Sequence, residues 1–314
     1  EQIVEYIENL HFSKEDVAYL RSLNTFTETF LEYLSTFSFH GDLYAFPEGT
    51  IMYPNEPVIT VIAPLIDAQL VETAILAQIN HQSLVATKTA RIVKAAEGKM
   101  VSDFGARRAH NMDAAVYGAR ASYIGGAAGT ATVLAGQMFG IPVSGTMAHS
   151  WVMYYKDEYE AFKNYAVNYP DNTVLLVDTY DTIQSGIPNA IRVAHEILEP
   201  KGKRLKGIRI DSGDLAYQSS KVRKMLDQEG LTDCRIIVSN SLDEHTISSL
   251  NVQKACIDGY GVGERLITGA TSDYSDDTLA VLGAVYKIAA VEENGVFTPR
   301  IKISGTVEKI TNPG

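Results

Sequence analysis

The chain has 314 residues, 46% of them apolar, and no apolar run as long as the ~18 residues that a membrane helix needs. This composition indicates a soluble, globular protein with an ample core. The formal net charge of −11 argues against nucleic acid or an acidic membrane as the main partner, because phosphates are bound by basic surfaces. Cys234 and Cys256 lack a metal-binding spacing, which argues against zinc and indicates a reducing compartment. We therefore expect a cytoplasmic protein.

The first third of the chain is predicted to be mostly helical. Residues 1–38 carry apolar side chains at helical spacing, with Ser13 and Asp16 in the pattern of a helix cap. Over 39–64, short β-branched runs broken by Pro and Gly predict a small antiparallel sheet. Neither Pro nor Gly occurs between positions 64 and 98, so one long helix or two joined helices should follow.

Between positions 100 and 263, apolar strands alternate with helical stretches at a period of roughly 30 residues. The alternation predicts βα units with right-handed crossovers, and therefore an α/β fold with parallel strands. Seven strands would be one short of a full eightfold barrel. They are expected at about 100–104, 122–125, 141–146, 173–178, 207–211, 234–239 and 257–262.

The tail is predicted to form a β-hairpin. One strand is expected over 286–291 and its partner over 296–303, joined by a turn at Asn294-Gly295. We expect this hairpin to rejoin the N-terminal sheet, which makes that domain discontinuous. The predicted domains are 1–98 with 277–314, and 99–276.

His149 follows the short apolar stretch 141–146, and Asp178 lies at the tip of the next strand. Because the carboxyl ends of parallel strands meet at one edge, the two side chains are expected to be neighbours. A carboxylate that binds one ring nitrogen fixes the tautomer and activates the other nitrogen. His149 is therefore predicted to be a base or a phosphoryl acceptor, although a lone histidine is commonly a buried side chain satisfied by the backbone.

Acidic residues follow two consecutive strands. Asp178 and Asp211 lie at the strand tips, where paired acids can orient a histidine, bind a ribose diol or hold Mg²⁺ through water. Asp181 and Asp214 lie three residues further on, where capping of a helix is an equally good interpretation.

Three loops at this edge have the composition of anion-binding segments. Phe104, Arg107 and Arg108 could stack on a planar ligand and fork onto phosphate, or the arginines could be a solvated pair at a helix start. The small residues 125–132 and the Gly261–Gly263 loop offer backbone N–H groups, although both could serve packing alone. Ser239 could add a hydroxyl donor.

Taken together, the motifs resemble those of the nicotinate phosphoribosyltransferase family. They occur in collinear order from about residue 40 to the end of the chain, which makes the resemblance specific. The matching segments are Ala45-Phe46-Pro47-Glu48-Gly49-Thr50, 68–73, Asp103-Phe104-Gly105 with Arg107-Arg108, Gly145-Thr146-Met147-Ala148-His149-Ser150, 178–182, Arg209-Ile210-Asp211-Ser212-Gly213-Asp214 and Gly261-Val262-Gly263.

The resemblance implies an irregular seven-stranded α/β barrel with a discontinuous open-faced β-sandwich domain. It also implies condensation of nicotinate with phosphoribosyl pyrophosphate to give nicotinate mononucleotide and pyrophosphate, for NAD salvage. The reaction would use Mg²⁺ and be coupled to ATP hydrolysis through a phosphohistidine. A homodimer with shared active sites is expected, to which an N-terminal segment that this chain does not contain would add an aromatic ring.

Site roles follow from the same resemblance. His149 would be phosphorylated, with Asp178 as its orienting partner, and Asp211 would lie near the ribose or near Mg²⁺ through water. Phe104 would stack on the pyridine ring and Arg209 would face nicotinate. The other expected substrate-binding residues are Arg107, Arg108, Thr130, Ser239, Gly261 and Gly263.

Substrate choice is predicted from one loop residue. The nicotinamide-using relatives carry an Asp where this chain has Ala131, and an Asp there would repel the carboxylate of nicotinate. The alternatives are a nicotinamide phosphoribosyltransferase and a non-catalytic nucleotide-binding relative. A dinucleotide-dependent oxidoreductase fits less well, because its glycine spacing after the first strand is missing.

Overall fold

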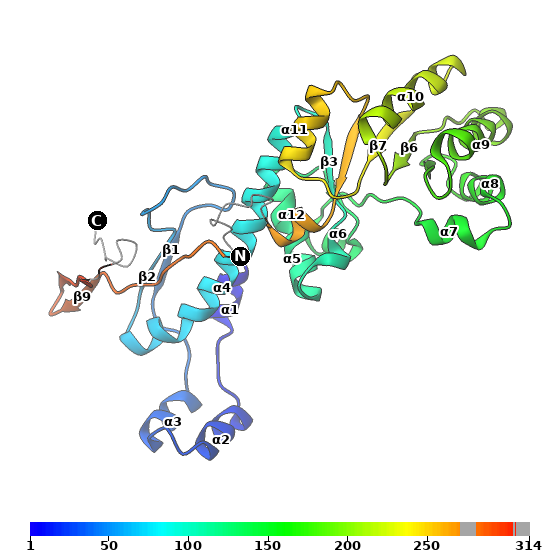
Figure 1. The fold of residues 1–314 in the computed structure, drawn as a ribbon. Helices are drawn as coiled ribbons and strands as arrows, with labels where there is room; N and C mark the ends of the chain where they lie inside the picture. The colour runs from blue at the N-terminus through cyan, green and yellow to red at the C-terminus, as the bar shows by residue number, and fades with distance from the viewer. Residues whose placement is uncertain (271–280, 304, 306–314) are drawn as a thin grey trace. The chain divides into compact units, whose positions relative to one another are not determined.

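The computed structural model describes residues 1–270, 281–303 and 305 (Figure 1). The chain divides into two compact units, one made of Glu1–His81 with the described residues after 280, the other of Gln82–Ala280. Helix α4 (Leu65–Ala95) runs through the boundary between them. It is one continuous helix, the first of the two alternatives that the absence of Pro and Gly in that stretch left open.

The first unit begins with three short helices, α1 (Gln2–Glu8), α2 (Lys14–Ser22) and α3 (Glu28–Ser35). The predicted cap is confirmed: the Ser13 side chain accepts from the Asp16 backbone N–H, and the Asp16 carboxylate accepts from the Ser13 backbone N–H. Strands β1 (Asp42–Ala45) and β2 (Ile59–Ile62) then pair antiparallel, which confirms a small sheet in this stretch.

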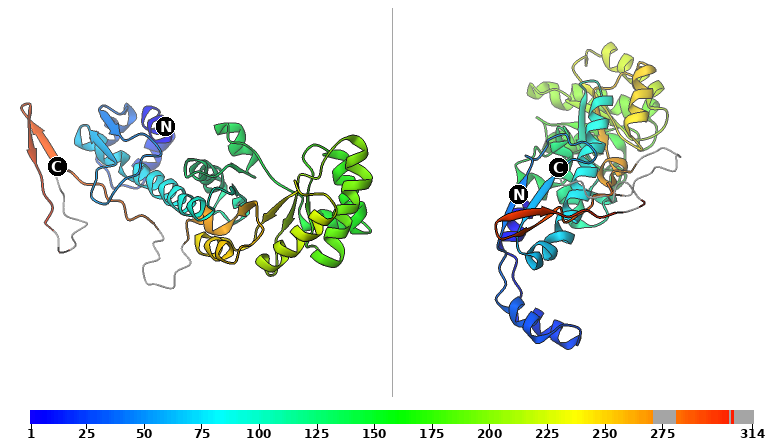
Figure 2. Two further views of the ribbon diagram at one scale, coloured as in Figure 1. Left: turned by 90° about the horizontal axis from the view of Figure 1, so that it is seen from above. Right: turned by 90° about the vertical axis from the view of Figure 1, so that its left-hand side faces the viewer.

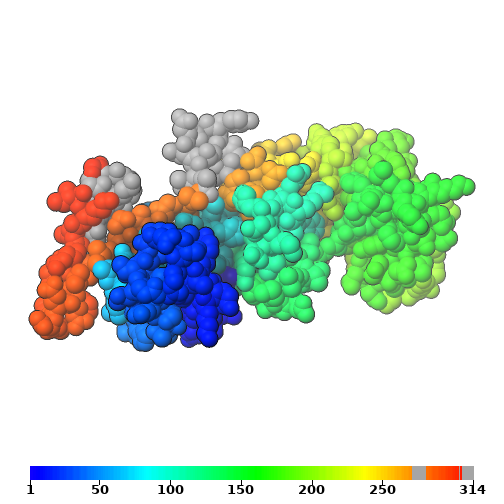
Figure 3. All heavy atoms as spheres, turned by 90° about the horizontal axis from the view of Figure 1, so that it is seen from below, coloured from blue at the N-terminus to red at the C-terminus, as the bar shows by residue number. Residues whose placement is uncertain are grey.

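The predicted hairpin is confirmed, as strands β9 (Ala290–Glu293) and β10 (Val296–Pro299), drawn in red in Figure 2. Asn294 and Gly295 both have positive φ angles, as a tight two-residue turn requires. Among the described residues, β9 and β10 pair with each other and not with β1 or β2, so the expected pairing with the N-terminal sheet is not seen, although the hairpin belongs to the same compact unit as that sheet. Strand β10 is exposed along its whole length (Figure 3), and its apolar side chains Val296 and Phe297 are exposed with it.

The second unit is an α/β layer structure around one parallel sheet of six strands in the order β4-β3-β8-β7-β6-β5. All its neighbouring strands pair parallel, which confirms the predicted α/β fold with parallel strands. The strands are β3 (Met100–Asp103), β4 (Gly129–Thr130), β5 (Val174–Leu176), β6 (Gly207–Ile210), β7 (Arg235–Val238) and β8 (Gly259–Val262).

Helices alternate with these strands, and the apolar side chains of both form one core that includes Leu175, Ile208 and Ile236. The helices are α5 (Met112–Ile124), α6 (Val133–Phe139), α7 (His149–Tyr154), α8 (Glu158–Asn168), α9 (Ile187–Val193), α10 (Leu215–Gln228), α11 (Glu244–Val252) and α12 (Glu264–Thr268). Within the described ranges, no helix is both long and apolar enough to cross a membrane.

Two predicted strands are wrong. Residues 122–125 are the last turn of α5 and its cap, and the strand comes later, as β4, because Gly126 turns the chain at φ 102°. The stretch 141–146 contributes only an isolated parallel bridge between Val143 and Thr130. Pro142 has no N–H to donate, which shortens the ladder that this stretch can form.

Candidate active site

The register of the parallel sheet places polar residues in one row at the strand ends. Leu176 lies opposite Arg209, and Ile210 lies opposite Val238, so the ends of β5, β6 and β7 bring Asp178, Asp211 and Ser239 side by side. Residues opposite each other in parallel strands share a face. The row is therefore the place where the sequence-predicted side chains meet.

Arg209 is the centre of a hydrogen-bonded group in this row, called the Arg209 cluster below. Its guanidinium donates from Nε to Ser239 Oγ over 2.9 Å, from Nη1 to Thr146 Oγ1 over 2.8 Å and from Nη2 to Asp211 Oδ1 over 3.0 Å. The Ser239 hydroxyl in turn donates to Asp211 Oδ1. Arg209 is thus held in one orientation by acceptors from three different segments of the chain.

His149 is the first residue of α7 and borders the cluster. Its Nε2 lies 3.6 Å from Asp211 Oδ2, and its Nδ1 lies 3.1 Å from Thr179 Oγ1. The His149 side chain is 39% exposed, so it is no core histidine and a ligand can reach it. Sequence reasoning missed Thr179, whose position directly after Asp178 was the available signal.

The expectation that Asp178 orients His149 is not what the structure shows. The Asp178 carboxylate accepts from the Asp211 backbone N–H over 2.9 Å and from Ser212 Oγ over 2.5 Å. The register explains this, because Asp178 lies beside Asp211 one strand away. Asp178 therefore fixes the turn that carries Asp211, and Asp211 is the carboxylate that faces the imidazole.

Several contacts act on the pKa of Asp211. Burial by itself raises this pKa, but the hydrogen bond from Ser239 and the positive charge of Arg209 outweigh it, and His149 adds to the effect. The pKa of Asp211 is consequently lowered from its ordinary value. The carboxylate is ionised at neutral pH and presents a full negative charge to His149.

Phe104 covers the adjacent part of the row, where β8 contributes Gly261. The Arg209 guanidinium carbon lies 5.5 Å from the centre of the Phe104 ring, within the range of a cation–π contact. A Cβ on Gly261 would overlap the Phe104 ring, so a glycine is needed there for close packing. Gly263 precedes α12, and its carbonyl accepts from Ile267 N. Phosphate binding by this loop stays a prediction.

A second hydrogen-bonded network supports the turn that carries Phe104. The Asp103 carboxylate accepts from Thr130 Oγ1 over 2.7 Å and from the Gly105 backbone N–H over 2.8 Å. Burial raises the pKa of Asp103 above its ordinary value, although both hydrogen bonds oppose the shift. Thr130 was expected to bind substrate, but it is fully buried and its hydroxyl donates its single hydrogen to Asp103.

Arg107 and Arg108 lie in a short 3₁₀ turn after Phe104, and both side chains are exposed. Arg108 Nε is 3.7 Å from Glu264 Oε2, a surface pair that contributes little to stability. In the part of the chain that the structure describes, no hydrogen bond or ion pair joins Arg107 or Arg108 to the Arg209 cluster. The following helix α5 is capped by Asn111, whose Oδ1 accepts from Ala114 N.

Asp181 and Asp214, for which two interpretations were open, both cap helices. Asp181 Oδ1 accepts from the backbone N–H groups of Ile183 and Gln184. Asp214 Oδ1 accepts from the Tyr217 backbone N–H over 3.0 Å. Their carboxylates are therefore occupied in starting helical segments.

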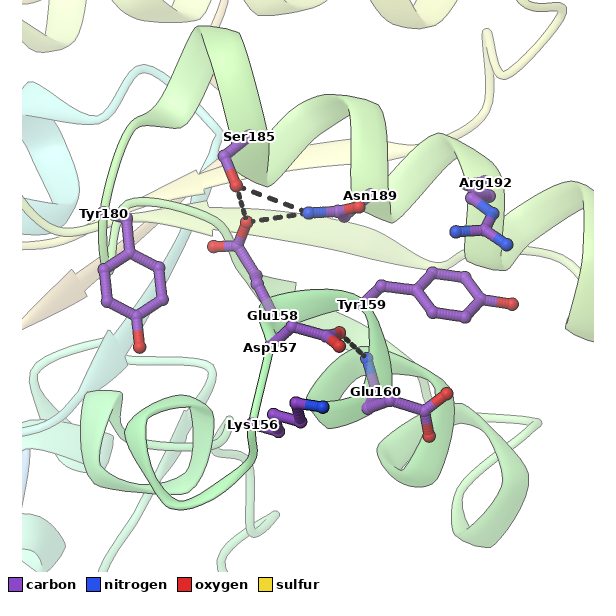
Figure 4. A pocket seen from close by; sticks show the side chains of 9 residues that line it. All are labelled: Lys156, Asp157, Glu158, Tyr159, Glu160, Tyr180, Ser185, Asn189 and Arg192. Atoms are coloured by element: carbon purple, nitrogen blue, oxygen red, sulfur yellow. Dashed lines mark hydrogen bonds between the residues drawn. The ribbon is translucent and has the colours of Figure 1, made fainter.

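A cavity of about 620 Å³ lies in a different part of the second unit (Figure 4). None of the predicted site residues lines it. Its buried carboxylate, Glu158, accepts from Ser185 Oγ and Asn189 Nδ2, and Arg192 lies over the Tyr159 ring at 3.8 Å. These contacts fasten α8 to the segment that follows Thr179. The side-chain cluster, and not this cavity, locates the candidate active site.

Two protein-family models match the chain. The model of the nicotinate phosphoribosyltransferase N-terminal domain matches residues 1–80, and the model of the nicotinate phosphoribosyltransferase family matches residues 100–310. The chain belongs to the nicotinate phosphoribosyltransferase family. The family model spans every residue of the Arg209 cluster and the Phe104 turn.

Two curated relatives match the chain over 99% of its length or more. A nicotinate phosphoribosyltransferase of Bacillus subtilis is 52% identical over 316 residues, which cover 100% of this chain and 62% of that protein. One from Mycobacterium tuberculosis is 44% identical over 314 residues, covering 99% of this chain and 64% of that protein. The chain thus spans less than two thirds of the length of these relatives.

Solved structures show the same fold. The crystal structure of human nicotinic acid phosphoribosyltransferase aligns with a TM-score of 0.76 at 29% identity, covering 83% of this chain and 63% of that one. The structure of nicotinate-nucleotide pyrophosphorylase from Pyrococcus furiosus aligns with a TM-score of 0.62 at 31% identity. The alignment covers 72% of this chain and 57% of that one.

Proposed function

We propose that the chain carries the active site of a nicotinate phosphoribosyltransferase, which joins nicotinate to phosphoribosyl pyrophosphate in NAD salvage. The observation that carries the proposal is the cluster of Arg209, Asp211 and His149 at the carboxyl ends of the strands, in a chain of this family. Such a cluster offers a cation for a carboxylate and an exposed imidazole beside an anion.

Nicotinate would bind at Arg209 and Phe104. A guanidinium has five N–H groups, and three of those of Arg209 are occupied by Ser239, Thr146 and Asp211. The remaining two can bind the substrate carboxylate while the Phe104 ring stacks on the pyridine. Ala131, which carries no charge to repel that carboxylate, favours nicotinate over nicotinamide.

Phosphoribosyl transfer requires neutralisation of the leaving pyrophosphate, because the pyrophosphate takes the bonding electrons and gains negative charge while positive charge grows at the ribose carbon. Arg107 and Arg108 are exposed beside the Phe104 turn and would supply that charge. Among the described residues, no group of three His, Cys, Asp or Glu side chains could hold a metal ion. A Mg²⁺ carried by the pyrophosphate needs only one or two carboxylates, and Asp211 would bind it through water.

ATP would phosphorylate His149. The imidazole is accessible and faces the ionised Asp211, which holds the ring in place. A phosphoryl group adds negative charge and acceptor oxygens beside the substrate-binding loops, and so changes how they bind a cationic metal complex.

The proposal extends to architecture and assembly. We propose that the parallel sheet is part of an irregular seven-stranded barrel, with an open-faced sandwich domain formed by 1–98 and 277–314, part of which lies outside the described residues. The bridge between Thr130 and Val143 supports a seventh strand position beside β4. A cytoplasmic homodimer with shared sites is part of the same proposal.

The test is to incubate the chain with phosphoribosyl pyrophosphate, Mg²⁺ and either nicotinate or nicotinamide, with and without ATP, and to measure the mononucleotide. We expect product from nicotinate, stimulated by ATP, and loss of the stimulation in His149→Ala. Product from nicotinamide alone would contradict the role of Ala131. Full ATP stimulation in His149→Ala would contradict the phosphohistidine.

A further inference from the structure

Ser239 is a buried serine whose hydroxyl is fully committed inside the protein. It follows β7, is 4% exposed, and its Oγ accepts from Arg209 Nε over 2.9 Å and donates to Asp211 Oδ1. A hydroxyl has a single hydrogen, so donation to Asp211 leaves none for a substrate. Ser239 was expected to bind substrate, but its contacts are those of a residue that holds two charged side chains against each other.

Asp211 divides its two oxygens between the two halves of the cluster. Oδ1 accepts from Ser239 and Arg209, whereas Oδ2 faces His149 Nε2 at 3.6 Å. The two oxygens belong to one rigid carboxylate, so any rotation that changes the contacts of Oδ1 also moves Oδ2. The setting of the imidazole is therefore tied to the contacts of the guanidinium.

Arg209 also contacts the loop that leads to His149. Its Nη1 donates to Thr146, three residues before His149 in the same loop. A carboxylate bound to the guanidinium would compete with Asp211 and Thr146 for the positive charge of Arg209, and so weaken the contacts of Arg209 with both. Because the surroundings are half-buried, this redistribution is screened less than it would be in water. The Asp211 carboxylate, which faces His149 Nε2, and the Thr146 hydroxyl, which lies in the loop that leads to His149, would both respond to it.

We propose that Ser239 is a positioning residue that makes the setting of the His149 ring depend on whether a substrate carboxylate occupies Arg209. The inference rests on the proposed function in one respect, that the carboxylate is that of nicotinate. It gives a physical route by which binding of the pyridine substrate controls the histidine that ATP would phosphorylate.

The direct test uses the chain labelled with ¹⁵N in its histidine rings. The His149 signals are assigned from the spectrum of His149→Gln, and nicotinate is added to saturation, with nicotinamide as the uncharged analogue. In the unaltered chain the His149 ring signals should shift with nicotinate and not with nicotinamide. In Ser239→Ala this shift should be lost, while calorimetry still detects nicotinate binding.

A matched control is Ser219→Ala in α10. Ser219 is also fully buried, but its hydroxyl donates only to Ala216 O of its own helix, so the His149 shift should persist. A second readout is the amount of mononucleotide formed per ATP hydrolysed, which should fall in Ser239→Ala and recover in Ser239→Thr, where the hydroxyl is kept. A purely structural role would lower all activities together and leave this ratio unchanged.

Four results would overturn the proposal: no His149 shift in the unaltered chain, the same shift in Ser239→Ala, its loss in Ser219→Ala, or no nicotinate binding in Ser239→Ala. The last would make Ser239 a direct binding residue. Failure of the proposed function is seen separately, as absence of mononucleotide from the unaltered chain, because the ring signals report on binding without turnover.

Discussion

Asp103 and Asp211 both follow the apolar residues of parallel strands in the same sheet, yet the structure uses them in opposite ways. Asp103 is fully buried, accepts from two neutral donors and has a raised pKa. Asp211 is partly exposed, faces Arg209 and His149 and has a lowered pKa. The difference shows that charge compensation, and not position at a strand end, separates a candidate catalytic acid from a structural one.

Removal of Arg209 should give the largest effect. In Arg209→Ala, the substrate carboxylate loses its cation and Asp211 loses its charged partner, so kcat/KM should fall by about 100- to 1000-fold. The control is Arg204→Ala, which removes a surface arginine paired with Asp233 and Glu199. Steady-state kinetics of both variants check this, and equal activities would contradict the central role of the Arg209 cluster.

Removal of Asp103 should act on folding. Asp103→Ala leaves the Thr130 hydroxyl and the Gly105 N–H without a partner in a buried place, which costs about 1–3 kcal/mol per unsatisfied group. The free energy of unfolding, measured in urea, should fall accordingly. An Asp103→Ala chain with unchanged stability would show that the buried network is not what holds the Phe104 turn.

The two glycines of the loop after β8 offer a matched pair. A Cβ at Gly261 would overlap the Phe104 ring, so Gly261→Ala should lose about 1–3 kcal/mol of stability and weaken nicotinate binding. At Gly263 the nearest atom to a new Cβ is Phe104 O at 3.4 Å, so Gly263→Ala should be better tolerated. Urea unfolding of both variants tests the packing, and an equal loss in both would count against it.

The smallest expected effect is on the pH dependence of stability, which should differ between variants of Asp211 and Asp103. The lowered pKa of Asp211 means that its ionised form stabilises the folded chain above the ordinary value of 3.8, and that this contribution is lost as pH falls through the folded value. Asp211→Asn should therefore be less stable than the unaltered chain at neutral pH, with a gap that narrows in acid.

Asp103 should behave in the opposite sense, because its raised pKa means that the folded chain holds the proton more tightly than the unfolded chain does. Ionisation of Asp103 then lowers the stability of the folded chain above its folded pKa. As pH falls, the free energy of unfolding of the unaltered chain should therefore rise relative to that of Asp103→Asn. Thermal unfolding between pH 3 and 7 compares the two variants, and parallel curves would contradict the assigned shifts.

Much of the candidate site could be predicted because the ends of buried strands can be recognised in the sequence. Apolar β-branched runs mark the strands before Asp178, Asp211 and Ser239, and parallel pairing then requires the ends to meet. His149 was predicted from its place after an apolar stretch that turned out to form only a bridge, and the role of Arg209 came from the family resemblance. The absence of Pro and Gly predicted helical structure over the stretch of α4, although it left open whether one helix or two would form.

Partner choice could not be predicted, because it depends on register and on side-chain rotation. Sequence order pairs His149 with the acid of the following strand, Asp178, whereas the register turns that carboxylate toward the Asp211 backbone. The strand expected at 122–125 failed for a local reason. Its residues continue the helical spacing of α5, and only the turn at Gly126 shows where β4 begins.

The most direct test of the central claim is a crystal structure of the chain with nicotinate bound. The account predicts that the carboxylate of nicotinate is hydrogen-bonded to Arg209 and that its ring stacks on Phe104, with His149 beside the bound ligand. Nicotinate found in the cavity lined by Lys156 and Arg192, with Arg209 still contacting only Ser239, Thr146 and Asp211, would contradict it.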